Sequence, residues 1–351
     1  MKKYVCNVTI GIPVYNAENY IERCLISVLN QTFADLEILL VDDCGTDNSI
    51  LKSETLAKTY ANGNKIRICH HDKNKGVAEA RNTILDEAKG KYIYFMDSDD
   101  SISKDAIEVL FNKAEATNAE TVWGSFVNKD SETEQDLPAI NGLGQYPDLY
   151  FFGEDQLALY GCQDIKEHLQ QSIWNILFRS DFLRKNNLRF EQHGSFDDGI
   201  FQAAMQPLVK RAVLMSACTY FYYHRPDSLT HVVNRKGFRI EEAINAIEAI
   251  DCHRKICQSL AGKVYFDCRC TKVMKEAFYI AVGIIKHRNE MNGMVSNEQV
   301  KGIMKHPATL LQIIQFHHYR LYNLFFFFLS ILPSSVLVRI IGLMAHRKQL
   351  M

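Results

Sequence analysis

The chain has 351 residues, 47% of them hydrophobic, and a net charge of −1 at neutral pH. This length can bury a large core and predicts one large domain with a smaller appendage. The balanced charge gives no reason to expect nucleic acid as a partner, and the ten cysteines lack the Cys-x-x-Cys pairs of a zinc site, so we expect free thiols in a reducing compartment.

Strands and helices alternate along the first part of the chain. Lys2 and Lys3 lead straight into a strand pattern without a long apolar segment or cleavage signature, so we expect a cytoplasmic protein that is not exported. Apolar runs predict strands at 8–13, 36–41, 66–69, 91–96 and 121–127, and helices end near residues 29, 60, 88 and 118. Asn16 and Asp47 are expected to cap the first two helices. The alternation predicts an α/β fold with a mostly parallel sheet covered by helices on both faces.

The later parts of the chain have a different character. Residues 128–150 are polar and predict a surface loop that contributes to acceptor binding, whereas residues 238–320 predict helices. The tail holds two apolar stretches on either side of Pro333, each too short to cross a bilayer as a helix. With basic residues at its end, the segment 321–348 predicts a membrane-surface anchor. A buried helix hairpin and an oligomer contact are the alternatives.

The strongest candidate site follows the apolar run 91–96, where Asp97 and Asp99 stand in an Asp-x-Asp pattern. Ligands bind at the carboxyl ends of strands in open α/β sheets, and paired carboxylates suit a hard divalent cation. One alternative is a calcium loop, but Ile102 stands where such a loop needs glycine. The other alternative is a helix cap, which needs one acid rather than three.

Other charged residues are weaker candidates when taken one at a time. Asp42 and Asp43 follow the second predicted strand and could accept hydrogen bonds from a ribose or a base, although a solvated turn is the alternative. Arg81 could donate to a phosphate or lie on the surface. Asp197 and Asp198 could supply a helix cap or a general base, and the pattern alone does not choose between these roles.

The order and spacing of several motifs together resemble the family 2 glycosyltransferases. The clear resemblance covers residues 7–127, and a patchier match continues to about residue 235. The motifs are Ile12-Pro-Val-Tyr-Asn16, Ser27-Val-Leu-Asn-Gln-Thr32, Val41-Asp-Asp-Cys-Gly-Thr-Asp47, Asn74-Lys-Gly76, Ala80-Arg-Asn82, Phe95-Met-Asp-Ser-Asp-Asp100, Trp174-Asn-Ile-Leu-Phe178, Phe196-Asp-Asp-Gly-Ile-Phe201 and Tyr223-His-Arg-Pro-Asp-Ser-Leu-Thr230.

The resemblance implies a GT-A fold, a Rossmann-like sheet flanked by helices, and metal-dependent transfer of a sugar, of the hexosyltransferase type, with inversion. The donor is expected to be a nucleotide sugar, usually UDP-linked. Asp97 and Asp99 would hold Mg²⁺ or Mn²⁺, and Asp198 would be the general base. Asp197 stands where glutamate is more common in the family, so the choice of base between Asp197 and Asp198 is open. The residues implied in donor binding are Pro13, Tyr15, Asp43, Arg81, Asp97, Ser98 and Arg225.

The resemblance also implies a division of labour along the chain. Residues 1–235 would form the transferase domain, with a donor half at 1–127 and an acceptor half at 128–235, and residues 236–351 a helical C-terminal region. The absence of a Gln-x-x-Arg-Trp motif predicts a non-processive enzyme. The acceptor would be a hydroxyl of a glycan or lipid-linked molecule, in surface polysaccharide assembly at the cytoplasmic face of the inner membrane.

Two other functions compete with this prediction. A sugar nucleotidyltransferase should have a glycine-rich, basic loop after the first strand, where this chain has Val-Tyr-Asn-Ala-Glu. A non-catalytic nucleotide-sugar-binding protein would not need acids at both candidate sites. The identity of the sugar and of the linkage does not follow from the sequence.

Overall fold

The computed structural model describes residues 4–137, 147–162, 169–225 and 239–347, which form two compact units. The first unit comprises Met1–Leu157, Ile165–Gln192 and Ala204–Ser228. The second comprises Ala158–Asp164, His193–Ala203 and Leu229–Met351.

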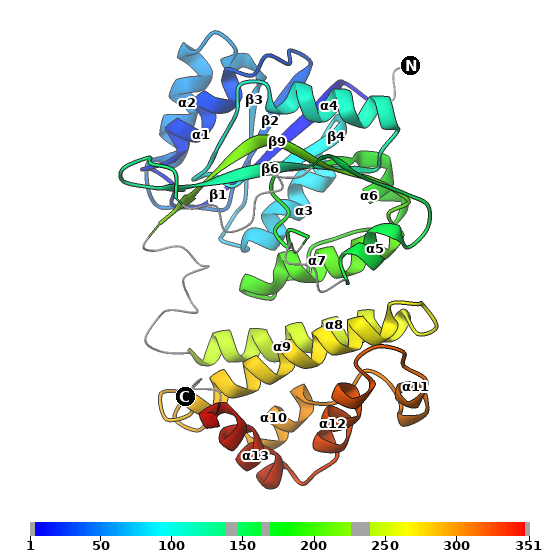
Figure 1. Cartoon of the computed structure of the whole chain (residues 1–351). Coiled ribbons are helices and arrows are strands. Elements are labelled where there is room, and N and C mark those ends of the chain that lie inside the picture. The colour runs from blue at the N-terminus through cyan, green and yellow to red at the C-terminus, as the bar shows by residue number, and fades with distance from the viewer. Residues whose placement is uncertain (1–3, 138–146, 163–168, 226–238, 348–351) are drawn as a thin grey trace. The chain divides into compact units, whose positions relative to one another are not determined.

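A nine-stranded mixed sheet is the centre of the first unit in the described part of the chain (Figure 1). Its order is β3-β2-β1-β4-β8-β6-β9-β5, and β7 pairs with β9. The first four strands in this order are parallel, whereas β8 runs antiparallel to both β4 and β6. The strands are β1 (Cys6–Val14), β2 (Leu36–Asp42), β3 (Ile66–His70), β4 (Gly90–Phe95), β5 (Ser101–Ile102), β6 (Thr121–Asp130), β7 (Leu149–Phe152), β8 (Ile176–Arg179) and β9 (Arg211–His224).

Helices cover both faces of this sheet. α1 (Ile21–Leu29) and α4 (Ala106–Thr117) pack on one face, and α3 (Val77–Glu87) and α6 (Ser180–Lys185) on the other. α3 lies close to β1 because Gly11 has no side chain: a Cβ there would come 2.3 Å from Ile84. α2 (Ser49–Thr59) packs beside α1, and α5 (Gln156–Tyr160) follows β7.

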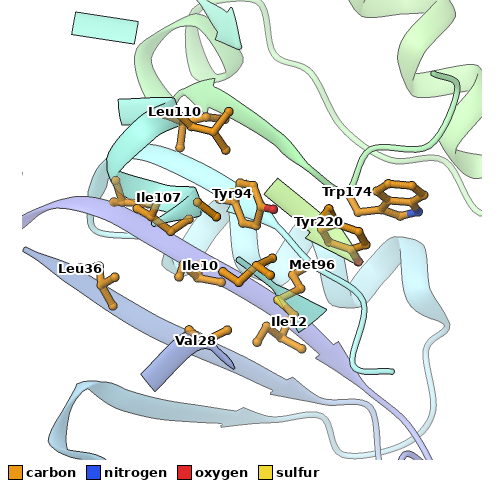
Figure 2. Packing of buried hydrophobic residues seen from close by; sticks show 14 of the residues in the cluster. Ile10, Ile12, Val28, Leu36, Tyr94, Met96, Ile107, Leu110, Trp174 and Tyr220 are labelled. Atoms are coloured by element: carbon orange, nitrogen blue, oxygen red, sulfur yellow. The ribbon is translucent and has the colours of Figure 1, made fainter. Parts of the chain in front are cut away.

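The main hydrophobic core lies between the sheet and the α1–α4 layer (Figure 2). Ile10 and Ile12 of β1 point into it, as do Val28 of α1 and Ile107 of α4. Successive residues of a strand point to opposite faces, so β2 buries Ile38 and Leu40 in this core and Leu39 and Val41 on the opposite face. This burial on both faces explains why β2 appears in the sequence as a continuous apolar run.

The predicted strands and helices of residues 1–127 are confirmed, but the predicted caps are wrong. α1 begins at Ile21 rather than directly after Asn16, whose backbone has φ 48° and whose side chain accepts from the Thr46 N–H at 2.8 Å. Asp47 stands two residues before the start of α2 and accepts from the N–H groups of Glu18 and Ser49. Both side chains instead hold together the two loops that follow β1 and β2.

The second unit is helical in its described part, as predicted for residues 238–320. The long helices α8 (Ile240–Ser259) and α9 (Phe266–Lys286) pack together with α10 (Asn297–Ile303), α11 (Leu310–Ile314), α12 (Arg320–Ser330) and α13 (Ser334–Arg347). The ten cysteines are free thiols in the structure, and five of them are buried. Among the described residues, no helix is both long and apolar enough to span a membrane.

A buried polar network connects the helices of the second unit and gives its stability a pH dependence. His306 is 6% exposed, accepts from the Ala308 N–H at 3.0 Å and contacts Asn323 Oδ1 through Nε2 at 3.0 Å. Asn323 in turn donates to Thr271 Oγ1 at 2.8 Å. Burial lowers the pKa of His306 below its usual range, and the imidazole therefore stays neutral in the folded protein.

We expect the free energy of unfolding to fall as the pH drops below about 6.5, the pKa of an unfolded histidine. In that window the unfolded chain takes up a proton that folded His306 does not, so acid favours unfolding. His306→Gln should reduce this pH dependence in urea unfolding followed by circular dichroism. His346→Gln, at an exposed position on α13, is the control that should leave it unchanged. An unaltered pH dependence in His306→Gln would contradict this assignment.

Candidate active site

Four neighbouring parallel strands end at one edge of the sheet. β3, β2, β1 and β4 lie side by side, and Val14 pairs with Asp42, which pairs with His70. Each strand end is followed within two residues by a polar side chain, in chain order Tyr15, Asp43, His71 and Asp97. The structure thus brings the predicted Tyr15, Asp43 and Asp97 to the same edge, and Tyr15 is 51% exposed there. Pro13, the second-to-last residue of β1, is half-buried.

Asp43 organises the turn that leads into α3. Its Oδ1 accepts from the Lys75 N–H at 2.8 Å and contacts His71 Nδ1 at 2.7 Å, while Oδ2 accepts from the Gly76 N–H at 2.8 Å. Gly76 has φ 88°, which disfavours a side chain at this position. A carboxylate offers about four acceptor sites, so Asp43 keeps capacity for one more donor. The same contacts fix the start of the helix that carries Arg81.

Three carboxylates gather in the turn after β4. Oxygens of Asp97, Asp99 and Asp100 lie within 4.8 Å of one another. Arg81 Nη2 lies 3.3 Å from Asp97 Oδ1, and Arg225 Nη2 lies 2.5 Å from Asp99 Oδ2. The side chains of Asp97 and Asp99 are 33% and 16% exposed. The two acids predicted as metal ligands are therefore accessible, and each lies beside a guanidinium group.

Asp100 differs from its two neighbours because it is fully buried. Tyr220 donates to its Oδ2 at 2.6 Å and the Tyr223 N–H donates to its Oδ1 at 2.9 Å. Burial, with the nearby charges of Asp99 and Asp97, raises the pKa of Asp100 well above its usual range. This internally bonded carboxyl anchors the turn to β9 and leaves Asp97 and Asp99 as the acids that can face a ligand.

Several residues that support the turn were not predicted. Arg23 of α1 donates to the Asp99 carbonyl at 2.7 Å, with its guanidinium 3.5 Å from the centre of the Tyr223 ring. Tyr220 also accepts from the Asp97 N–H at 3.3 Å. The apolar, aromatic run 212–223 is the signal that could have predicted β9 and its tyrosines. Arg23 gives no such signal, because a lone arginine in a helix usually lies on the surface.

The acid pair 197–198 begins α7 (Asp197–Met205), which belongs to the second unit. Asp197 is 2% exposed and accepts from the His193 N–H, so it stabilises the turn before the helix. Asp198 is half-exposed. Asp197 is therefore buried and bonded to the turn before the helix, and Asp198 is the more accessible carboxylate of the pair.

The side-chain oxygens in the turn after β4, which we call the strand-edge turn, are suited to bind a divalent cation. Mg²⁺ is commonly held by one or two carboxylates, with phosphate oxygens and water completing its shell. Asp97 and Asp99 supply two such carboxylates on one turn, and half-exposed Ser98 lies between them. No sulfur or imidazole ligand belongs to this cluster of the described residues, which favours Mg²⁺ or Mn²⁺ over softer metals.

Residues 9–171 match the family model described as Glycosyl transferase family 2. This part of the chain, a little under half of its length, is therefore similar to that family. The match covers the strand-edge turn and both flanking strands, and therefore agrees with the motifs noted above. The match confirms, over these residues, the resemblance predicted from the sequence.

The chain is also similar in sequence to curated glycosyltransferases and in fold to a solved structure. The chain is 29% identical over 229 residues to glycosyltransferase GlyA of Streptococcus pneumoniae, covering 65% of this chain and 32% of that protein. It is 30% identical over 234 residues to the uncharacterized glycosyltransferase EpsJ of Bacillus subtilis, covering 64% and 63%. The chain thus spans less than two thirds of the length of either relative. S. aureus TarS 1–349, solved with UDP-GlcNAc, superimposes with a TM-score of 0.65 at 15% identity, over 98% of this chain and 92% of that chain. This likeness confirms the predicted fold.

Proposed function

We propose that this protein is an inverting, non-processive glycosyltransferase of family 2. It would transfer a sugar from a UDP-linked donor to a hydroxyl of a glycan or lipid-linked acceptor. The observation that carries the proposal is the pair of accessible acids, Asp97 and Asp99, at the edge where four parallel strands end, with Arg81 and Arg225 beside them. The UDP-GlcNAc bound to the similarly folded TarS supports a UDP-linked donor.

The donor would lie along the strand edge. Tyr15 and Asp43 follow β1 and β2, and we assign them to the nucleoside, with Asp43 using its remaining acceptor capacity. Asp97 and Asp99 would hold Mg²⁺ or Mn²⁺, which when bound supplies positive charge to the diphosphate leaving group. The diphosphate and the two carboxylates are all negatively charged. The diphosphate would therefore lie beside them only when a cation is bound between them.

Arg81 and Arg225 can each pair with either a carboxylate or the diphosphate of the donor. In the structure they offset the charge of Asp97 and Asp99. A guanidinium group matches phosphate oxygens as well as it matches a carboxylate. With the acids engaged in the donor complex, we expect both arginines to donate to the diphosphate instead. They would thus stabilise the charge that develops on the leaving group.

The chemical step would be a single displacement with Asp198 as general base. Asp198 accepts the proton of the acceptor hydroxyl as that oxygen forms a bond to the anomeric carbon. The bond between the anomeric carbon and the diphosphate oxygen breaks, and its electron pair leaves with the nucleoside diphosphate. One bond is formed on the face opposite to the one that is broken, so the anomeric configuration inverts.

Thermal unfolding with candidate nucleotides tests the proposal. A ligand that binds only the folded state at about 100 times its Kd raises the free energy of unfolding by about 2.7 kcal/mol. We expect UDP with Mn²⁺ to raise the melting temperature, and UDP alone, Mn²⁺ alone and ADP with Mn²⁺ to raise it less. Detection of a glycosylated product then separates an enzyme from a binding protein. Equal shifts for all nucleotides, with and without Mn²⁺, would reject the proposed donor site.

A further inference from the structure

The C-terminal segment of the chain is strongly basic, although the whole chain is nearly neutral. No aspartate or glutamate occurs after Glu298. The 53 residues that follow carry six positive charges, whereas the preceding part has 34 basic and 41 acidic residues. The six are Lys301, Lys305, Arg320, Arg339, Arg347 and Lys348. A segment without negative charge is suited to a negatively charged surface.

The same segment concentrates exposed apolar side chains. Among the described residues, twenty large apolar side chains are exposed, and nine of them lie between residues 311 and 343. These nine are Leu311, Ile314, Tyr319, Leu321, Phe325, Phe328, Ile331, Val336 and Leu343. Single exposed apolar residues are common on proteins, but so dense a group indicates an interaction surface.

Helix α12 divides its apolar residues between two faces. Phe326 and Leu329 are buried in the core of the second unit. Leu321, Phe325 and Phe328 are 81%, 45% and 51% exposed, and their spacing of four and three residues puts them on one face. The two sets explain why the sequence is apolar all round this helix. Internal packing accounts for one face, and the other is left exposed among the described residues of the unit.

Helix α13 repeats the division and adds charge. Leu337 and Ile341 are buried, whereas Val336, Arg339 and Leu343 are exposed at a spacing of three and four residues. An outward face on which arginine stands between two aliphatic side chains differs from the acidic and basic mixture of an ordinary solvated helix. It combines apolar contact with attraction to anions.

We propose that the outward faces of α12 and α13 bind the surface of an anionic lipid bilayer. The exposed phenylalanine and leucine side chains would enter the boundary between headgroups and acyl chains, while Arg339 and Arg347 pair with lipid phosphates. The helices lie on the surface rather than span it, since no described helix is long and apolar enough to cross. The lack of acids removes the repulsion that a protein surface of mixed charge would feel there. This inference does not depend on sugar transfer.

Sedimentation of the full chain with lipid vesicles tests the proposal. We expect binding to vesicles of phosphatidylcholine with phosphatidylglycerol, little binding to phosphatidylcholine alone, and weaker binding at high salt. Each of Arg339→Gln and Arg347→Gln should weaken binding about fivefold, the equivalent of about 1 kcal/mol per basic residue. Phe325→Ser with Phe328→Ser should weaken it about tenfold or more per ring.

The matched control is Leu51→Ser, since Leu51 is 61% exposed on α2 in the other unit. It should bind vesicles like the wild type. Circular dichroism checks that each variant folds. If the phenylalanine variants do not fold, the arginine variants alone test the proposal. The proposal is overturned if the wild type ignores anionic vesicles. It is also overturned if the variants bind as well as the wild type, or if they only convert a dimer into a monomer in sedimentation equilibrium.

Discussion

Asp99→Asn is expected to lower kcat/KM for sugar transfer by about 10²–10³-fold, the loss typical when one group that stabilises developing charge is removed. An amide has the shape of the carboxylate but no negative charge, so the variant would hold a divalent cation weakly. It would also lose the ion pair with Arg225, which the structure shows at 2.5 Å. Calorimetry should therefore show UDP binding that no longer improves when Mn²⁺ is added.

The control for this variant is Asp86→Asn. Asp86 also forms an ion pair with an arginine, Arg189, at 2.7 Å, but its side chain is 58% exposed and it lies on α3 away from the strand-edge turn. We expect this variant to keep turnover and manganese dependence. Wild-type manganese dependence in Asp99→Asn would remove Asp99 from the ligand set.

Asp198→Asn is expected to lower turnover by about 10²–10⁴-fold, the usual contribution of a positioned general base. The asparagine amide cannot take the proton of an acceptor hydroxyl. Donor binding should stay close to wild type, because Asp198 is assigned to the proton of the acceptor hydroxyl and not to the nucleotide. Turnover at saturating donor, together with UDP affinity, separates the two effects.

Asp197→Asn tests whether Asp197, rather than Asp198, is the general base. Asp197 is buried and accepts from the His193 N–H, so its replacement should mainly lower the melting temperature. If Asp197→Asn loses turnover while Asp198→Asn keeps it, the base has been assigned to the wrong member of the pair.

The sequence predicted the strand edge because its pattern is local. Strands β2 and β4 are buried on both faces and therefore appear as apolar runs, and the acids that follow them stand out in the sequence. Because parallel strands end at the same edge of a sheet, Asp43 and Asp97 are then expected at that same edge. No long-range contact had to be known to place these residues together.

What the sequence could not resolve depends on contacts between distant segments. Three acids in one turn have the same chemistry, and only burial against Tyr220 and Tyr223 separates Asp100 from Asp99. Likewise, Asn16 has the composition of a helix cap, but its side chain is used by Thr46 across the neighbouring loop. In both places a tertiary hydrogen bond overrode a local preference.

Diffraction from crystals grown with UDP and Mn²⁺, collected at the manganese absorption edge, tests the central claim most directly. We predict an anomalous peak bonded to Asp99 in the turn after β4, with diphosphate oxygens on its other side and the uridine running toward Asp43. A manganese peak bound elsewhere, or UDP lodged away from the ends of β1, β2 and β4, would contradict the account.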